Sequence, residues 1–300
     1  MKLALFLSLA ACGLCIADAA AAAGKATTPT SGKAFVDETF LTIQVGDYKA
    51  KFLQKWAWTL RACDFQGKKL LIPGGVFQTV VNEQVPKGTD SFIGGGHRPE
   101  SLQSIELLVD GKPYEPKPGL TVEGSSFTVH KTTRISAFWQ DARVTVDADG
   151  IAEDFRYEVK GDTSKVNFMY PFMHCFTNDT RRWIAALADG SEMRGTFTDD
   201  MAFTLKKDIL WAMVYAPKTA IGAVYAYPEA YKTIRIRNAF WNRKHDNKLY
   251  LTVNPKRQVG DTFHYAVRLK GFAAGNDDWE RVGRETLKHV QQALAVTKEQ

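Results

Sequence analysis

Short runs of alternating apolar and polar residues, separated by Asp-Gly or Gly-Asp dipeptides, recur along most of this chain. The dipeptides stand at Gly46-Asp47, Asp110-Gly111, Asp149-Gly150 and Asp189-Gly190. Asp and Gly adopt the positive φ angles that a two-residue hairpin turn requires, so each dipeptide predicts a β-hairpin. Strands do not alternate with helical segments, which disfavours a parallel sheet. We therefore expect an all-β fold, a large antiparallel sandwich of about sixteen strands.

One amphipathic helix is predicted at the C-terminus. Asn276 or Asp277 can cap its first turn, and apolar side chains then recur at spacings of three to five residues. These side chains belong to Trp279, Val282, Leu287, Val290 and Leu294. Because this spacing forms one apolar stripe, we expect residues 276–300 to form a helix packed on a β domain over residues 34–275.

The N-terminus has the composition of a secretory signal peptide. Lys2 precedes an apolar run from Leu3 to Ile16, and Ala17-Asp18-Ala19 supplies the small residues that a signal peptidase recognises. The run is shorter than the roughly 20 residues that a transmembrane helix needs. We therefore expect a signal peptide over residues 1–23, a flexible lead over residues 24–33, and export to the periplasm or the medium.

The cysteines leave two alternatives open. Leu9-Ala10-Ala11-Cys12 resembles a bacterial lipobox, and lipidation of Cys12 would attach the protein to a membrane. The sequence stays apolar as far as Ala23, however, whereas a tethered lipoprotein usually turns polar at once, so soluble export is preferred. Cys63 and Cys175 remain after cleavage, as either one disulfide or two buried thiols.

The formal net charge of +6 is dispersed along the chain. Basic residues stand in isolated pairs such as Lys68-Lys69 and Arg181-Arg182, whereas nucleic-acid binding favours a basic stripe with interleaved aromatic groups, so no nucleic-acid partner is expected. The sequence contains no G-x-x-x-x-G-K-[ST] loop, no G-x-G-x-x-G motif between a strand and a helix, and no H-E-x-x-H motif. We expect no cofactor, and no metal because no two histidines share a ligand-like spacing.

The segment from Phe92 to Glu100 concentrates polar chemistry behind three glycines. Gly95 and Gly96 let the backbone pass close to a ligand, and Arg98 offers a planar fork to a carboxylate. His97 titrates near neutral pH, and Glu100 is a candidate general base. The segment therefore predicts a site for a sugar or a uronate. The alternative is a glycine turn whose polar side chains are simply solvated.

The segment Lys165–Asn178 predicts a long apolar strand with His174 in its middle. A strand that is buried on both faces belongs in the centre of a sandwich. A histidine in such a strand must find a hydrogen-bond partner or face a cavity. His174 is therefore either a candidate catalytic residue or a core histidine bonded to a neighbour.

The stretch from Arg143 to Asn178 resembles the middle of galactose mutarotase-like proteins. In those proteins a strand pair precedes a strand with the motif T-N-H-x-Y-F-N, whose histidine is the general acid on the sugar ring oxygen. His174 takes that position here, and Asn254–Tyr265 resembles the closing L-x-P-G-E-x-Y strand pair. The resemblance implies a β-supersandwich fold, a carbohydrate partner and a catalytic role for His174.

The general base of that superfamily has no clear counterpart. Its L-E-T-Q segment corresponds to Ile234–Asn242, which contains no acid, and Glu229 lies out of register. Trp241, beside Asn242, is the best candidate for stacking on a sugar. The leading hypothesis is an exported carbohydrate-recognising protein that acts on a sugar or uronate. The alternatives are a non-enzymatic carbohydrate-binding or envelope-structural protein, and a polysaccharide lyase or hydrolase.

Overall fold

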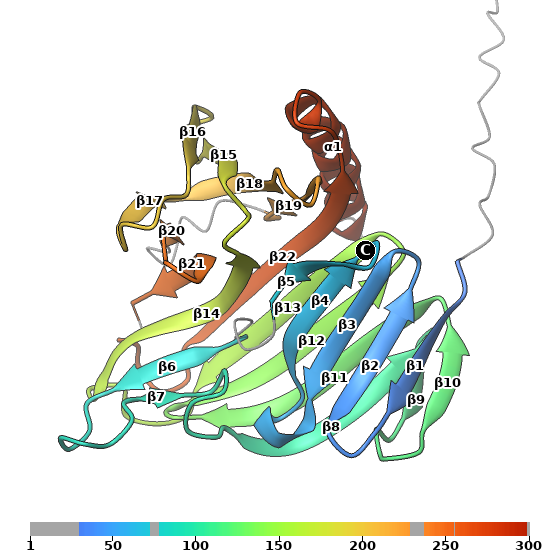
Figure 1. Cartoon of the computed structure of the whole chain (residues 1–300). Coiled ribbons are helices and arrows are strands. Elements are labelled where there is room, and N and C mark those ends of the chain that lie inside the picture. Colours follow the sequence, from blue (N-terminus) through green and yellow to red (C-terminus); the bar gives the residue numbers. More distant parts are fainter. Residues whose placement is uncertain (1–29, 73–77, 229–236, 255, 299–300) are drawn as a thin grey trace, which may run out of the picture.

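The computed structural model describes residues 30–72, 78–228, 237–254 and 256–298, which form three antiparallel sheets and one long helix (Figure 1). The predicted signal peptide, Cys12, most of the predicted lead and Glu229 lie outside the described residues. The expected all-β fold with a C-terminal α-helix is confirmed. Within the described ranges, no helix is long and apolar enough to cross a membrane.

The first sheet, called the N-terminal sheet below, has six strands in the order β10-β1-β2-β3-β4-β5. They are β10 (Thr121–Gly124), β1 (Gly32–Val36), β2 (Phe40–Val45), β3 (Tyr48–Leu53), β4 (Thr59–Phe65) and β5 (Lys68–Leu71). β2 and β3 form the predicted hairpin, and Gly46 in its turn has a φ of 53°. A short 3₁₀ turn, η1 (Gln54–Trp56), follows β3.

The large sheet has ten strands in the order β16-β15-β18-β19-β22-β13-β12-β11-β8-β9. They are β16 (Glu192–Thr196), β15 (Arg182–Leu187), β18 (Ile209–Ala216), β19 (Ile221–Ala226), β22 (Thr262–Ala273), β13 (Gly150–Val159), β12 (Phe138–Asp147), β11 (Ser126–Ile135), β8 (Ser101–Val109) and β9 (Lys112–Tyr114). Asp110 and Gly111, between β8 and β9, have φ angles of 49° and 80°, as the hairpin prediction requires. Burial alternates along β12 and β13, so one face of this sheet lines the core and the opposite face, called the outer face, points away from it.

The third sheet, called the β14 sheet, has six strands in the order β17-β20-β21-β14-β6-β7. They are β17 (Phe203–Lys207), β20 (Arg237–Trp241), β21 (Asp246–Val253), β14 (Val166–Thr177), β6 (Val80–Glu83) and β7 (Phe92–Ile93). β14 is the long apolar strand predicted around His174. Phe172 and Phe176 face the core, whereas Met173 and Cys175 face the opposite side of the sheet.

The main core lies between the large sheet and the two smaller sheets. Phe52 of the N-terminal sheet, Tyr265 of the large sheet and Phe172 of the β14 sheet are fully buried in one cluster. The rings of Phe172 and Tyr265 stack with their centroids 5.0 Å apart. Cys63 and Cys175 are buried free thiols, so the alternative of a disulfide between them is excluded.

The C-terminal helix α1 (Trp279–Lys298) packs on the outer face of the large sheet, on β19 and β22. Leu287 and Val290 belong to the apolar cluster beneath it, and Trp279 stacks on Tyr215 with ring centroids 5.3 Å apart. A Cβ atom on Gly283 would lie 2.9 Å from the sulfur of Met213, so glycine lets the helix approach the sheet closely here.

Candidate functional site

His174 lies inside the sandwich. Its side chain is 2% exposed, and its Nε2 atom lies 2.8 Å from Oε1 of Glu153, a β13 residue whose side chain is 1% exposed. The rings of Phe172 and Tyr225 pack against the imidazole at centroid distances of 4.7 and 5.3 Å. The partner that a buried histidine requires is therefore Glu153. Because both side chains are buried, a sugar at the surface does not contact them in this conformation.

His97 and Arg98 follow β7 and pair with carboxylates that are close in the chain. His97 Nδ1 lies 3.2 Å from Oδ2 of Asp90, and the His97 ring stacks on Phe92 with centroids 4.9 Å apart. Arg98 donates to the carboxylate of Glu83 at 2.9 Å. These contacts bind the turn to nearby residues of the chain, Asp90 in the preceding loop and Glu83 in β6.

The strand register separates this turn from His174. Phe92, on which His97 stacks, pairs with Asn82, and Asn82 pairs with Phe168 of β14. His174 lies six residues further along β14, which corresponds to roughly 20 Å at about 3.3 Å per residue. The structure therefore does not bring His97 and His174 into one cluster.

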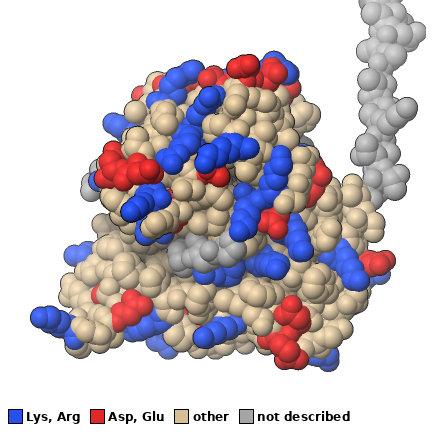
Figure 2. All heavy atoms as spheres, in the orientation of Figure 1, with Lys and Arg blue, Asp and Glu red and all other residues tan. Residues whose placement is uncertain are grey.

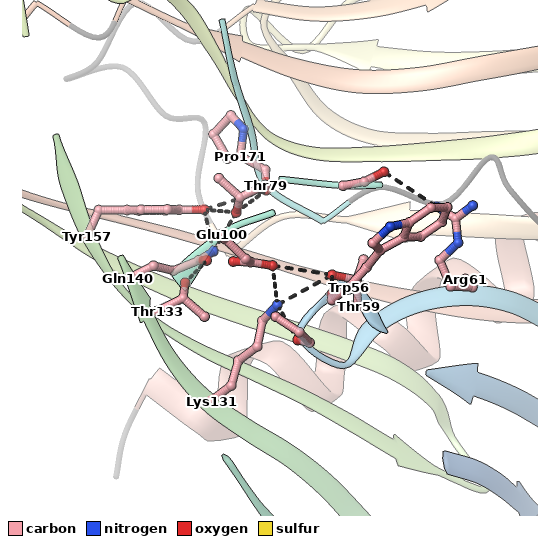
Figure 3. A network of polar contacts seen from close by, with 12 residues as sticks. Trp56, Thr59, Arg61, Thr79, Glu100, Lys131, Thr133, Gln140, Tyr157 and Pro171 are labelled. Atoms are coloured by element: carbon pink, nitrogen blue, oxygen red, sulfur yellow. Dashed lines mark hydrogen bonds and ion pairs between the residues drawn. The ribbon is translucent and has the colours of Figure 1, made fainter. Parts of the chain in front are cut away.

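Glu100 forms a buried ion pair with Lys131 of β11 (Figure 3). Lys131 Nζ lies 2.8 Å from Oε1 of Glu100, and the two side chains are 2% and 4% exposed respectively. The same ammonium donates to the carbonyl of Ala57 at 2.8 Å and contacts the hydroxyl of Thr59 at 3.4 Å. Three oxygen atoms therefore surround a cation that burial would otherwise penalise.

Lys131 holds a strained turn that follows η1. Ala57 and Trp58 have φ angles of 49° and 56°, a left-handed conformation that residues other than glycine rarely adopt. Such a conformation persists where surrounding contacts fix it. Here Lys131 binds the Ala57 carbonyl, and the Thr59 hydroxyl donates to the Trp56 carbonyl at 2.7 Å. The turn thereby sets the position of the Trp56 ring.

Trp56 and Arg61 form a stacked pair beside the glycine segment (Figure 3). The guanidinium carbon of Arg61 lies 4.0 Å from the Trp56 ring centroid, and the group donates to the Gly95 carbonyl at 3.4 Å. Arg61 is buried, which lowers its pKa to about 10, so the side chain is still cationic at neutral pH. Gly96 has a φ of 97°, and a Cβ atom there would lie 2.9 Å from the Trp56 ring. Gly95 and Gly96 therefore form the wall against which this pair is held.

A second buried polar network holds Thr79, the residue that precedes β6 (Figure 3). The hydroxyls of Thr79 and Tyr157 lie 2.8 Å apart, and Gln140 donates to the Thr79 hydroxyl and accepts from Thr133 at 3.1 Å. Burial raises the pKa of Tyr157, so its phenol stays neutral. A Cβ atom on Gly94 would lie 2.3 Å from the Thr79 carbonyl oxygen, which shows how closely the segment packs on this network.

The rest of the site lies on the side of β14 that faces away from the core. Met173 and Cys175 are packed there with Ile72, Tyr170 and Trp241. The Cys175 thiol interacts with the side chains of Asp246 and Lys248. Burial raises the pKa of Cys175 to about 12, which keeps the thiol neutral. Among the described residues, no group of three or more His, Cys, Asp and Glu side chains is placed to hold a metal ion.

Trp241 ends β20 and carries two cations close to its ring. The guanidinium carbon of Arg243 and the Nζ atom of Lys248 lie 4.7 and 5.7 Å from the ring centroid. Asp246 pairs with both, at 3.1 Å from Arg243 and 3.4 Å from Lys248. Phe203 of β17 is 43% exposed and stacks on Trp241 at a centroid distance of 5.4 Å. The arrangement presents a partly exposed aromatic surface beside positive charge.

We refer to these two groups of residues together as the hollow face. It consists of Trp56, Arg61, Gly95, Gly96, Met173, Phe203, Trp241, Arg243, Asp246 and Lys248. Three of them are cations and one is a carboxylate, so the local charge is +2. Figure 2 shows Lys and Arg side chains exposed on this side of the molecule.

The sequence predicts four substrate-binding residues, Gly95, Gly96, Arg98 and Trp241. Gly95, Gly96 and Trp241 belong to the hollow face, whereas Arg98 is paired with Glu83 outside it. Arg61 and Lys248 were missed. The available signal for Arg61 was a cation between apolar neighbours, as in the Thr59–Phe65 sequence TLRACDF, since a buried cation requires compensating contacts.

The chain is similar in fold to putative aldose 1-epimerases, although no family model and no curated protein matches its sequence. One such protein, from Klebsiella pneumoniae, matches with a TM-score of 0.52 and 10% identity over 84% of this chain and 83% of that chain. Another, from Escherichia coli, matches with a TM-score of 0.52 and 9% identity over 78% of this chain and 99% of that chain. This chain therefore shares its fold with these putative aldose 1-epimerases.

This likeness confirms, at the level of the fold, the resemblance inferred from Arg143–Asn178. That stretch contains the second half of β12 and all of β13 and β14. Identities of 9 and 10% show the fold alone, and one fold supports many activities. The role of the hollow face must therefore be argued from its own residues.

Proposed function

We propose that this protein binds carbohydrate at the hollow face, and that the preferred sugar carries a carboxylate, as a uronate does. The observation that carries the proposal is the occurrence of two tryptophan–guanidinium pairs. Trp56 pairs with Arg61 beside the glycine segment, and Trp241 pairs with Arg243 and also has Lys248 close to its ring. The fold similarity to putative aldose 1-epimerases supports a carbohydrate as the partner.

The two components of the hollow face suit the two parts of a uronate. The flat apolar face of a tryptophan covers the C–H groups of a sugar ring. Arginine donates two parallel hydrogen bonds to a carboxylate, and these bonds strengthen where water is excluded. Arg61 is 6% exposed, so its charge lies in such an environment. A neutral sugar would use the rings but would leave the positive charge without a partner from the ligand.

We propose recognition without turnover as the primary activity. His174 matches the general acid of the superfamily, but its imidazole is bonded to Glu153 in the core. His174, His97 and Glu100 therefore stay predictions as catalytic residues, as does a lyase or hydrolase activity. Anomer exchange of uronates followed by NMR, and release of unsaturated products followed by ultraviolet absorbance, test both enzymatic alternatives. We expect neither rate to exceed that of buffer.

Binding is tested by calorimetric titration of galacturonate and glucuronate oligosaccharides and of their neutral counterparts. We expect the uronates to bind more tightly, with an affinity that falls as salt is added, because ion pairing is screened. Trp241→Ala and Lys248→Met should each weaken uronate binding. The matched control is Trp139→Ala, which removes a half-buried tryptophan from the outer face of the large sheet. Equal binding of neutral and acidic oligosaccharides would contradict the proposed preference.

We also propose that the protein is exported, on the signal-peptide pattern of residues 1–23. Mass spectrometry of the protein purified from its source should give a mature N-terminus within Ala19–Gly24. A diacylglyceryl modification at Cys12 would instead establish the lipoprotein alternative.

A further inference from the structure

The outer face of the large sheet is covered by α1 over only part of its width. The helix packs on β19 and β22 through residues such as Leu287 and Val290. On β12 and β13 the outward side chains are half-buried or exposed, and Arg156 is 73% exposed. This part of the sheet is therefore open to a ligand.

Three adjoining depressions lie on the open part, with volumes of about 400, 490 and 390 Å³. Arg156 lines all three, and Asp141, Asp154 and His264 each line two. Ala152 lines two of the depressions, and its short side chain leaves space between the longer side chains around it. Because they share lining residues, the depressions lie side by side, and we call them together the groove.

The groove is long in the direction of the strands. On β12 it extends from Trp139 to Thr145, which is roughly 20 Å for six residues at about 3.3 Å each. Pro228 and the α1 residue Leu294 line the side of the groove that lies away from β12. Such a groove accommodates an extended chain of several units rather than a single sugar.

The charges in the groove come in pairs of opposite sign. Asp154 lies 3.0 Å from His264 and 3.6 Å from Arg156, and Asp141 lies 3.7 Å from Arg143. The groove thus lacks the cationic excess that a polyanion requires. Neighbouring carboxylate and guanidinium groups instead offer acceptors and donors side by side, an arrangement that suits pairs of sugar hydroxyls.

We propose that this groove is a second carbohydrate-binding surface, which takes a neutral, unbranched oligosaccharide or polysaccharide. Trp139 supplies an apolar ring surface at one end. Asp154 and Arg156 bind hydroxyl groups in the middle. The groove is formed by residues that the hollow face does not use, so it stands or fails independently of uronate binding.

NMR titration and calorimetry with linear hexasaccharides of glucose, mannose and galactose test the proposal. We expect at least one of them to produce saturable shifts at the Trp139 indole. Trp139→Ala and Arg156→Gln should each weaken that binding about tenfold or more, as expected for residues that carry much of the binding energy of a site. Arg156 is well exposed, so its replacement leaves the fold intact. Trp241→Ala on the hollow face should leave binding of the neutral chain unchanged.

The proposal is overturned if no neutral hexasaccharide shifts the Trp139 indole, or if both groove variants bind as the wild type does. It is also overturned if a protein or nucleic acid, rather than a saccharide, is the only ligand that competes for the groove. Uronate titration of the same variants separates the two surfaces. Loss of neutral-chain binding with intact uronate binding supports the groove, and intact neutral-chain binding in both variants overturns it whatever happens to uronate binding.

Discussion

Replacement of Lys131 by methionine should destabilise the protein more than any surface charge removal. The change keeps the length of the side chain but leaves the Glu100 carboxylate, whose side chain is 4% exposed, without its cation. Breaking a buried ion pair by removing one partner typically costs about 3–5 kcal/mol. The bond from Lys131 to the Ala57 carbonyl is lost as well. This loss is a large fraction of the roughly 5–15 kcal/mol that stabilises a typical domain.

Urea unfolding followed by tryptophan fluorescence measures this loss. At about 2–3 kcal/mol per molar urea, the midpoint should fall by roughly 1–2 M. Lys131→Met/Glu100→Leu should recover most of the stability, because replacing both charges by apolar groups removes the unpaired carboxylate. Lys117→Met, which breaks an exposed pair with Glu115, should change the midpoint little.

Measurement of uronate affinity separates the effect of Lys131→Met on stability from its effect on the Ala57–Trp58 turn. The double variant still lacks the bond that holds the Ala57–Trp58 turn, so it should regain stability without regaining full uronate affinity. A midpoint for Lys131→Met within about 0.3 M of the wild type would refute the reasoning, since a buried carboxylate without its cation is incompatible with a small effect. A double variant no more stable than the single one would refute it too.

Three further changes test other parts of the account. Gly96→Ala should lower the free energy of unfolding by about 1–3 kcal/mol and weaken uronate binding, because the new Cβ atom meets the Trp56 ring and the backbone φ is 97°. Gly260→Ala is the control: Gly260 has a φ of 93° with open space around it, so this variant should show only the backbone effect. Burial raises the pKa of the Cys63 thiol and raises that of Cys175 to about 12. Neither thiol should therefore react with a thiol reagent at pH 8 until the protein is unfolded, and labelling of the native protein would contradict this. The hydrogen bonds from Arg284, which join α1 to β16, lower the pKa of Glu192 below its usual value of 4.5. The pair should therefore stabilise the fold fully above pH 4.5, and this stabilisation should disappear as the pH falls through the lowered pKa. Both side chains are more than a third exposed, so Arg284→Gln should shift stability at pH 7 by less than about 1 kcal/mol and reduce the difference between pH 7 and pH 3; an unchanged pH dependence would contradict it.

The fold could be predicted because its signals are local. The Asp110-Gly111 turn and the alternation in β12 and β13 depend on residues next to one another in the chain. The division into three sheets could not be predicted in the same way. β1 joins β10 through pairs such as Gly32 with Gly124, and no local pattern specifies a partner so distant in the chain.

The candidate site likewise contains residues that local sequence signals point to and residues whose roles depend on long-range contacts. Gly95, Gly96 and Trp241 are conspicuous in the sequence because glycine runs and aromatics near turns have local meaning. Arg61 and Lys131 gain their roles from contacts 34 and 31 residues away, with Gly95 and Glu100. A cation in an apolar strand signals that partners exist, but the partners are set by packing.

Uronate binding at the hollow face is tested most directly by one measurement, an NMR titration of the indole N–H resonances with an oligogalacturonate. The account predicts saturable shifts at Trp56 and Trp241, which flank the cations Arg61 and Arg243, with Trp139 unmoved. Shifts confined to Trp139, or no shift at any indole at millimolar ligand, would contradict it.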